Sequence, residues 1–251
     1  MSDSRARGRI PGSCLGTGPA ARGTPVTDQD GRRQATLLFR SGTTATAELP
    51  DGTGLILPTL SVRATEFTVG EIGPAAMPAD LPPTSAYTYA VELSADEAEA
   101  LGATRITFSE PVAYYIENFL GLAVGADVPV GSYDRGRGVW EPEDNGRVIE
   151  VLDTTGGVAV LDIDGSEIAT SSTALAALGI DADELGVLAT LYQPGQTLWR
   201  AALSHFSPQD HNYAALPDCK APEVCIMSPC GPGGCLVQQD QCPNTSPGCV
   251  L

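Results

Sequence analysis

The chain has 251 residues, with 14 Lys and Arg against 31 Asp and Glu and a formal net charge of −17. So acidic a chain is a poor candidate for sequence-independent nucleic-acid binding, which needs a positive surface to displace counterions from phosphates. Its 28 Gly and 20 Pro, with only 6% aromatic residues, favour a turn-rich β protein over a helical one.

The first 33 residues are rich in Gly, Arg, Ser and Pro and show no hydrophobic periodicity. This composition predicts a flexible arm over residues 1–33. The segment lacks the apolar run of a signal peptide, and no apolar stretch of the chain approaches the roughly 20 residues that cross a bilayer. We therefore expect no membrane span.

Residues 35–73 are predicted to form a small β subdomain. Period-2 alternation and short apolar runs indicate strands, because alternate side chains of a strand share one face. The expected strands cover residues 36–39, 44–49, 55–57 and 60–69. The segment 74–83 is rich in Pro, which resists both helix formation and ladder pairing, and is expected to connect this subdomain to the next.

Residues 84–216 are predicted to form a larger β-rich domain. Its expected strands cover residues 88–93, 105–109, 112–117, 128–133, 139–140, 147–152, 158–161 and 197–206. Short strands at fairly regular spacing, with two or three short helices, favour a mainly β fold built from immunoglobulin- or fibronectin-like β-sandwich modules.

Two capping boxes predict where helices begin. The first, Ser-Ala-Asp-Glu at 94–97, is expected to open a short helix that Gly102 ends. The second, Asp-Ala-Asp-Glu at 181–184, is expected to open a helix that ends near Tyr192, before Pro194.

The last segment, residues 217–251, is a cysteine-rich tail with too little apolar bulk for a core. Its six cysteines are Cys219, Cys225, Cys230, Cys235, Cys242 and Cys249. An even number in a loop-rich segment makes them disulfide candidates in an oxidising compartment. Two alternatives stay open: an unpaired tail, and a zinc site, although zinc favours closer pairs than these spacings offer.

The common catalytic motifs are missing from the sequence. There is no G-x-S-x-G elbow, H-E-x-x-H pair, P-loop or G-x-G-x-x-G turn. The two histidines are His205 and His211, and Ser204 faces away from His205 if both lie on a strand. We expect no catalytic residue, no organic cofactor, and no hydrolytic or redox activity.

One acidic turn has the residue types of a calcium site. Asp162, Asp164 and Glu167 alternate around Gly165, and calcium is bound by oxygen ligands on loops that a glycine allows to bend. An acidic turn after a strand is also common without any metal, so the calcium hypothesis competes with a purely structural interpretation.

Several phrases of the chain match one family in order. They are the segment 81–145, from Leu-Pro-Pro-Thr to Glu-Asp-Asn, then Asp-Asn-Gly-Arg-Val-Ile at 144–149 and Leu-Tyr-Gln-Pro-Gly-Gln-Thr-Leu-Trp-Arg at 191–200. Over roughly residues 25–212, the chain resembles the segment that precedes the YD-repeat shell of bacterial RHS-repeat proteins, which is related to the fibronectin-plug region of teneurins. The cysteine-rich tail shows no such likeness.

The resemblance implies a structural role: a β-rich plug that packs against the YD-repeat shell of a parent or neighbouring protein, which encloses a toxin. It also implies a secreted or cell-surface parent, and a chain that is a truncated piece of a longer one. The alternative is a free-standing adhesive or ligand-binding β-sandwich module. The interface candidates are aromatic residues, namely Tyr114, Tyr115, Phe119, Trp140 and Trp199. Because Tyr114 and Tyr115 are adjacent on a strand, one ring is expected on the outer face.

Overall fold

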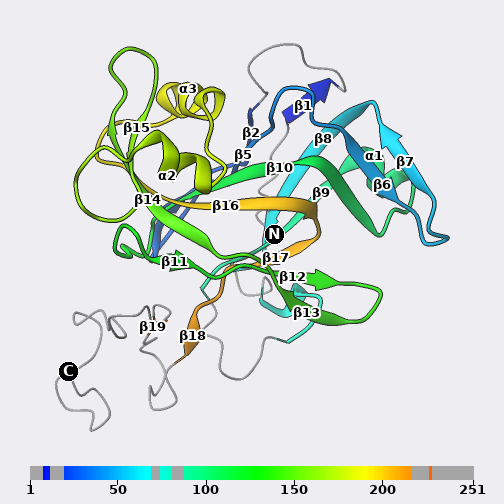
Figure 1. The fold of residues 1–251 in the computed structure, drawn as a ribbon. Coiled ribbons are helices and arrows are strands. Elements are labelled where there is room, and N and C mark those ends of the chain that lie inside the picture. Colours follow the sequence, from blue (N-terminus) through cyan, green and yellow to red (C-terminus); the bar gives the residue numbers. More distant parts are fainter. Residues whose placement is uncertain (1–7, 12–19, 69–73, 81–87, 216–225, 228–251) are drawn as a thin grey trace, which may run out of the picture.

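The computed structural model describes residues 8–11, 20–68, 74–80, 88–215 and 226–227. Two antiparallel sheets face each other, and two helices lie on the outer side of the larger sheet (Figure 1). The prediction of a mainly β sandwich is therefore confirmed. Its immunoglobulin or fibronectin likeness stays a prediction.

The smaller sheet has six strands. In spatial order they are β1 (Gly8–Pro11), β8 (Thr59–Glu66), β9 (Ala90–Ala95), β17 (Pro208–Asp210), β12 (Gly131–Asp134) and β13 (Val139–Pro142). Strand β8 shows why its residues form a strand: even-numbered side chains from Leu60 to Glu66 are buried and odd-numbered ones are half-exposed. This alternation is the period-2 pattern predicted for residues 60–69.

The larger sheet has nine strands. Its main path runs β11 (Asp127–Val128), β14 (Gly146–Asp153), β16 (Thr197–Phe206), β10 (Arg105–Glu117), β5 (Thr36–Leu38) and β2 (Ala20–Arg22). Beside this path, β15 (Val160–Asp162) pairs with β14, β6 (Ala45–Glu48) pairs with β10, and β7 (Gly54–Leu57) pairs with β6. The two strands predicted at 105–109 and 112–117 are one strand, β10, with a register irregularity between Thr107 and Val112.

The remaining elements are short. Two small ribbons pair β3 (Val26–Asp28) with β4 (Gly31–Arg33) and β18 (Ala214–Ala215) with β19 (Ile226–Met227). The helices are η1 (Pro74–Ala76), α1 (Asp96–Ala100), α2 (Ser172–Ala177) and α3 (Ala182–Leu191). The structure places only residues 74–80 of the predicted connector.

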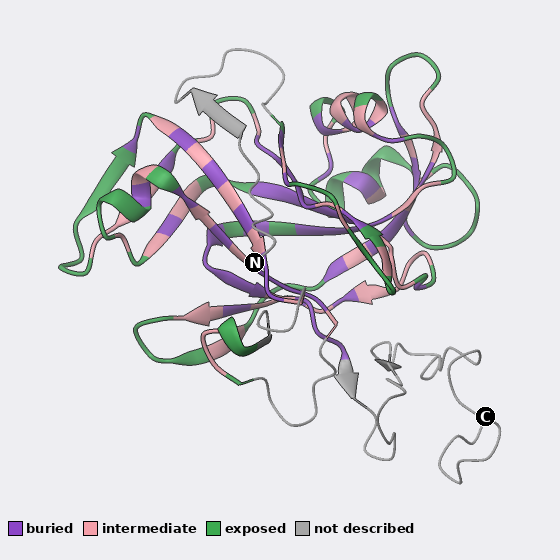
Figure 2. Cartoon of the chain, turned by 180° about the vertical axis from the view of Figure 1, so that it is seen from behind, coloured by how far each residue is buried: buried purple, intermediate pink, exposed green. Residues whose placement is uncertain are grey.

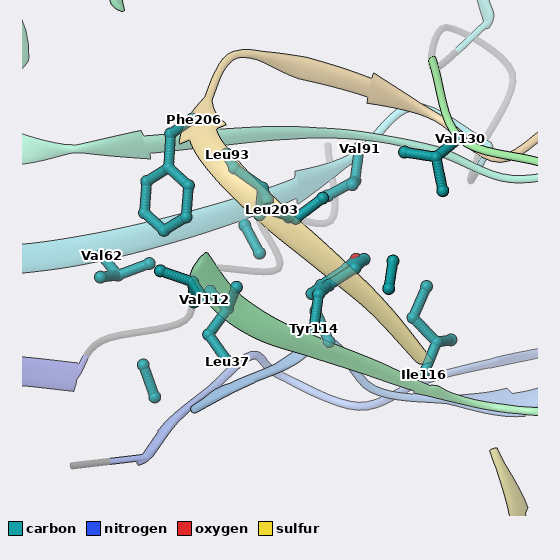
Figure 3. Close-up of a cluster of buried hydrophobic side chains, with 14 of the residues drawn as sticks. Leu37, Val62, Val91, Leu93, Val112, Tyr114, Ile116, Val130, Leu203 and Phe206 are labelled. Atoms are coloured by element: carbon teal, nitrogen blue, oxygen red, sulfur yellow. The ribbon is translucent and has the colours of Figure 1, made fainter. Parts of the chain in front are cut away.

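The main core lies between the two sheets. Side chains from both sheets interdigitate there, including Leu37, Val62, Leu93, Val112, Tyr114 and Phe206 (Figure 3). A second core lies on the other face of the nine-stranded sheet, under α2 and α3, and includes Tyr115, Ile149, Leu175 and Leu188. The nine-stranded sheet is therefore buried on both faces in this region.

The structure does not separate residues 35–73 and 84–216 into the two predicted β domains. Strands β5 and β6 pair with β10, and β8 pairs with β9, so segments 35–73 and 84–216 share both sheets. The predicted flexible arm is also wrong for residues 20–33, because β2 pairs with β5 and Arg33 is buried. Polar contacts hold this segment, and they leave no periodic apolar pattern in the sequence.

The two predicted helix starts have different outcomes. Helix α3 begins as expected, since Asp181 is its N-cap and accepts a hydrogen bond from the Glu184 backbone N–H at 2.8 Å. Helix α1 does not begin at Ser94: its N-cap is Ala95 and has no side-chain cap. The reason is that β9 continues through Ala95, which pairs with Val62. Its end at Gly102 agrees with the prediction, since Gly102 has φ of 67°.

Candidate functional site

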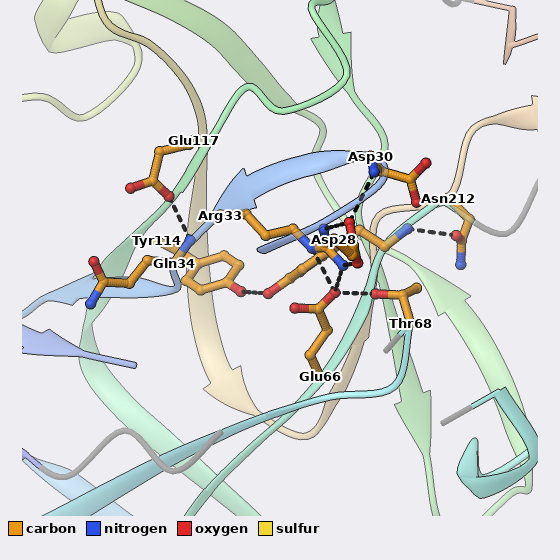
Figure 4. A network of polar contacts seen from close by, with 10 residues as sticks. Asp28, Asp30, Arg33, Gln34, Glu66, Thr68, Tyr114, Glu117 and Asn212 are labelled. Atoms are coloured by element: carbon orange, nitrogen blue, oxygen red, sulfur yellow. Dashed lines mark hydrogen bonds and ion pairs between the residues drawn. The ribbon is translucent and has the colours of Figure 1, made fainter. Parts of the chain in front are cut away.

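A buried arginine links the β3–β4 ribbon to strand β8 of the six-stranded sheet (Figure 4). Arg33, from β4, is 2% exposed. Its Nε donates to Glu66 Oε1 at 2.7 Å, and its two terminal nitrogens donate to the two oxygens of Asp28 at 2.9 and 2.7 Å. The guanidinium also lies 4.6 Å from the centre of the Phe119 ring. Each guanidinium nitrogen thus bonds to a carboxylate, and an aromatic ring lies against the cation.

The two carboxylates of this cluster differ electrostatically. The hydrogen bonds from Arg33 hold the pKa of Asp28 below its ordinary value. Burial raises the pKa of Glu66, even though Arg33 and the Thr68 hydroxyl bind its carboxylate. One cation cannot fully offset two carboxylates, and the more deeply buried of the two bears the cost.

A second buried arginine lies on the opposite side of the nine-stranded sheet. Arg200, in β16, binds both oxygens of Glu184 at 2.8 and 3.1 Å, and its third nitrogen donates to the Leu178 carbonyl at 2.9 Å. The Tyr115 hydroxyl donates to Glu184 Oε1 at 2.6 Å. Burial raises the pKa of Tyr115 far above its ordinary value, so this hydroxyl stays a donor. The cluster fastens α3 to the sheet.

A hollow among the described residues lies beside this second cluster. It has a volume of about 100 Å³ and is lined mainly by apolar side chains of β5, β10, β16 and α3. Arg40 lies at its border, where it donates to the Gly179 carbonyl at 2.5 Å and pairs with Asp181 at 3.0 Å. Neither Arg40 nor Arg200 was singled out from the sequence, because isolated arginines give no pattern there.

The histidines lie in two different environments. His205 Nε2 is 3.1 Å from Glu143 Oε1, and its Nδ1 is 3.4 Å from the Ser207 hydroxyl. Ser207 is 5% exposed and also contacts the Pro208 carbonyl and Gln209. Ser207 is therefore buried beside His205. Ser204 is exposed while His205 is buried, so the two side chains face opposite sides, as the sequence predicts.

His211 is part of the main core. Its ring stacks on Tyr114 with 5.6 Å between centres, and its Nδ1 is 3.2 Å from the Pro129 carbonyl. Burial lowers its pKa to about 4. His211 is therefore neutral at physiological pH and packs as an aromatic residue.

The acidic turn is organised around one buried carboxylate. Asp162 accepts backbone N–H bonds from Asp164 and Gly165, both at 2.9 Å, and from Glu167 at 2.7 Å. Burial opposes its ionisation, but these bonds outweigh burial and lower its pKa. Asp164 and Glu167 are exposed, and within the described ranges no three His, Cys, Asp or Glu side chains form a metal-binding group. Calcium binding at this turn stays a prediction.

Three predicted interface residues are buried inside the chain. Tyr114 faces the main core, Tyr115 faces the second core, and Trp199 donates from its indole nitrogen to Asn118 at 2.8 Å. Predicting an exposed ring was therefore wrong, since the sheet is covered on both faces. Phe119 and Trp140 are half-buried; Phe119 packs on Trp199 and Trp140 on Tyr133, each with 5.2 Å between ring centres.

The six cysteine candidates, Cys219, Cys225, Cys230, Cys235, Cys242 and Cys249, lie outside the described residues. In the part of the chain that the structure describes, no helix has the length and apolar character needed to cross a membrane. Comparison with models of protein families, with curated proteins and with solved structures finds no match to this chain.

Proposed function

We propose that this chain is a non-catalytic structural module. The observation that carries the proposal is the pairing of its buried charges: Arg33 with Asp28 and Glu66, and Arg200 with Glu184. In each cluster the charged groups bind one another and backbone or hydroxyl groups across elements. Groups committed in this way rigidify a fold, and none of them is left free to act on a substrate.

The specific role that we propose is that of the plug or support region of an RHS-type, YD-repeat shell protein. The resemblance of residues 25–212 to that segment supports this role, and so does a rigid two-sheet body. The burial of Tyr114 and Tyr115 removes the aromatic contact first expected for the shell. A shell would have to pack against other residues.

A free-standing ligand-binding module is the second candidate, and the hollow beside Arg40 favours it. Its volume of about 100 Å³ suits a small, mostly apolar group, and ligand sites combine apolar walls with a few polar groups. The paired Arg40 would orient a polar end of such a ligand.

Two experiments test the proposal. First, a panel of ester, glycoside and peptide substrates should give no turnover above that of a His205→Ala, His211→Ala double variant. Turnover that disappears in the double variant would overturn the non-catalytic assignment.

Second, the chain should co-purify with a co-expressed YD-repeat shell segment of a bacterial RHS protein. Failure to co-purify, together with saturable small-molecule binding that Arg40→Ala abolishes, would favour the ligand-binding module. Arg137→Ala, at an exposed arginine far from the hollow in sequence, is the matched control.

A further inference from the structure

One edge strand of the nine-stranded sheet lacks the usual protection against pairing with another chain. Sheet edges in natural proteins carry charges or prolines that block edge-to-edge association. Among the other edge strands of the two main sheets, β13 carries Glu141 and Pro142, β2 carries Arg22 and β11 carries Asp127. Strand β7, with the sequence Gly-Leu-Ile-Leu, has neither.

Strand β7 is also exposed. Ile56 is 72% exposed and Leu55 is 39% exposed, and Figure 2 shows the strand as exposed over most of its length at one margin of the molecule. Among the described residues it pairs with β6 alone. Its outer edge is therefore open to an extended segment.

The alternation of hydrogen-bonded and non-bonded pairs in the β6–β7 hairpin shows which backbone groups of β7 face outward. The Leu49 N–H donates to the Thr53 carbonyl at 2.9 Å, and Ala47 lies opposite Leu55. Antiparallel pairs alternate between bonded and non-bonded, so Leu55 and Leu57 bond to β6. The N–H and C=O groups of Gly54 and Ile56 point away from the sheet.

We propose that β7 is a docking edge for a second copy of this chain, paired antiparallel to itself about Leu55. In that register, Gly54 of each copy faces Ile56 of the other, and both residues offer outward backbone groups. The pairing closes four N–H···O bonds in a continuous sheet. If the centre of the pairing moves from Leu55 to Ile56, Gly54 of each copy lies opposite Pro58 of the other. Pro58 has no N–H to donate, so the register centred on Leu55 is favoured.

Side-chain shape and local charge also fit a second copy. Ile56 meets Gly54 of the other copy, which has no side chain to obstruct it, and the two Leu55 side chains meet in the close non-bonded position. Asp51, in the adjoining turn, lies opposite Thr59 rather than another carboxylate. Two chains of net charge −17 still repel each other, but salt screens this repulsion beyond about 8 Å at physiological ionic strength.

The dimer should be weak and should strengthen with salt. Pairing through a strand of four residues buries an area at or below that of stable complexes, so exchange between dimer and monomer is expected. This inference does not depend on the proposed plug role.

Sedimentation velocity of the full chain across a wide concentration range is the test, with a reductant present so that cysteines do not link chains. We expect a reversible monomer–dimer equilibrium that shifts toward dimer as salt rises. Hydrogen exchange should show that the Gly54 and Ile56 amides become protected at high concentration.

Two variants locate the interface. Ile56→Lys places a charge at the edge, and Ile56→Pro removes an outward N–H that β6 does not use. Both are expected to abolish the dimer while circular dichroism stays that of the parent. Ile168→Lys is the matched control, because Ile168 is a 67% exposed isoleucine elsewhere, and it should dimerise like the parent.

Two results would overturn the proposal. One is a parent chain that stays monomeric at high concentration and high salt. The other is a dimer that survives in Ile56→Lys, or whose formation leaves the Gly54 and Ile56 amides unprotected, which would place the interface on another surface.

Discussion

Arg33 and Arg200 are both buried, yet they are neutralised in different ways. Arg33 binds two carboxylates, one of which, Asp28, has a side chain 32% exposed. Arg200 binds one carboxylate, Glu184, whose side chain is 5% exposed, together with a hydroxyl and a carbonyl. A buried arginine therefore needs a hydrogen-bond acceptor for its donor groups. How deeply its carboxylate partner is buried decides how much stability is lost when the arginine is removed.

The largest effect is expected at Arg200. Arg200→Met leaves Glu184 buried with the Tyr115 hydroxyl as its remaining strong donor, and breaking such a pair costs about 3–5 kcal/mol of unfolding free energy. Urea denaturation of the full chain measures it. Arg137→Met, at an arginine whose side chain is 66% exposed, is the control and should cost less than about 1 kcal/mol. Equal losses in both variants would contradict a special role for the buried pair.

A smaller loss is expected at Arg33. Arg33→Met should cost about 3 kcal/mol, at the low end for a broken buried pair, because Asp28 can regain water. The pKa of Glu66 is already raised by burial and will rise further without Arg33. A carboxyl with a raised folded pKa adds stability at low pH and loses it as pH rises through that pKa.

The loss of unfolding free energy in Arg33→Met should therefore become smaller as pH falls below neutrality. The loss in Arg200→Met serves as the reference. Urea titrations of both variants and the parent at several pH values give this comparison. A loss in Arg33→Met that grows toward low pH would contradict the assignment of Glu66.

Asp210 sharpens the comparison, because it is a half-buried carboxylate without an arginine. Burial raises its pKa to about 6, against hydrogen bonds from Asn212 that act in the other direction. Stability from this group is present below its ordinary pKa and is lost as pH rises through about 6. The loss is on the order of 3 kcal/mol, since the pKa rises from 3.8 to about 6 and each pKa unit corresponds to about 1.4 kcal/mol.

Asp210→Asn keeps the acceptor oxygen and removes the titration. Relative to the parent, this variant should gain stability as pH rises from about 4 to about 7, the range that spans the ordinary pKa and the raised pKa of Asp210, as measured by urea midpoints. A constant difference across that range would show that Asp210 does not titrate there.

The smallest effects are expected at the adjacent tyrosines. The Tyr115 hydroxyl bonds to the charged Glu184, whereas the Tyr114 hydroxyl meets the neutral Tyr89 hydroxyl at 3.1 Å. Bonds to charged groups contribute about 1.5–3 kcal/mol and neutral ones about 1 kcal/mol. Tyr115→Phe should therefore destabilise the chain more than Tyr114→Phe in thermal or urea unfolding. The reverse order would indicate that Tyr115 is not bonded to Glu184.

Local patterns predicted much of the secondary structure. The alternation from Leu60 onward predicted β8, and the cap at Asp181 predicted α3, because both depend on residues within a few positions of one another. The cap at Ser94 failed because a distant strand, β8, extended β9 past it. Helix α2 was not predicted at all, since its six residues, Ser-Thr-Ala-Leu-Ala-Ala, bury only Leu175.

The sequence by itself determined the strand-rich class, most strand positions and the acidic surface, since these depend on composition and short-range periodicity. The tertiary structure alone decided which side chains share a site. Arg33 meets Glu66 across 33 positions, and Arg200 meets Tyr115 across 85; no local pattern encodes such pairs. It also decided that both Tyr114 and Tyr115 are buried, because a strand exposes a face only where no second layer packs on it.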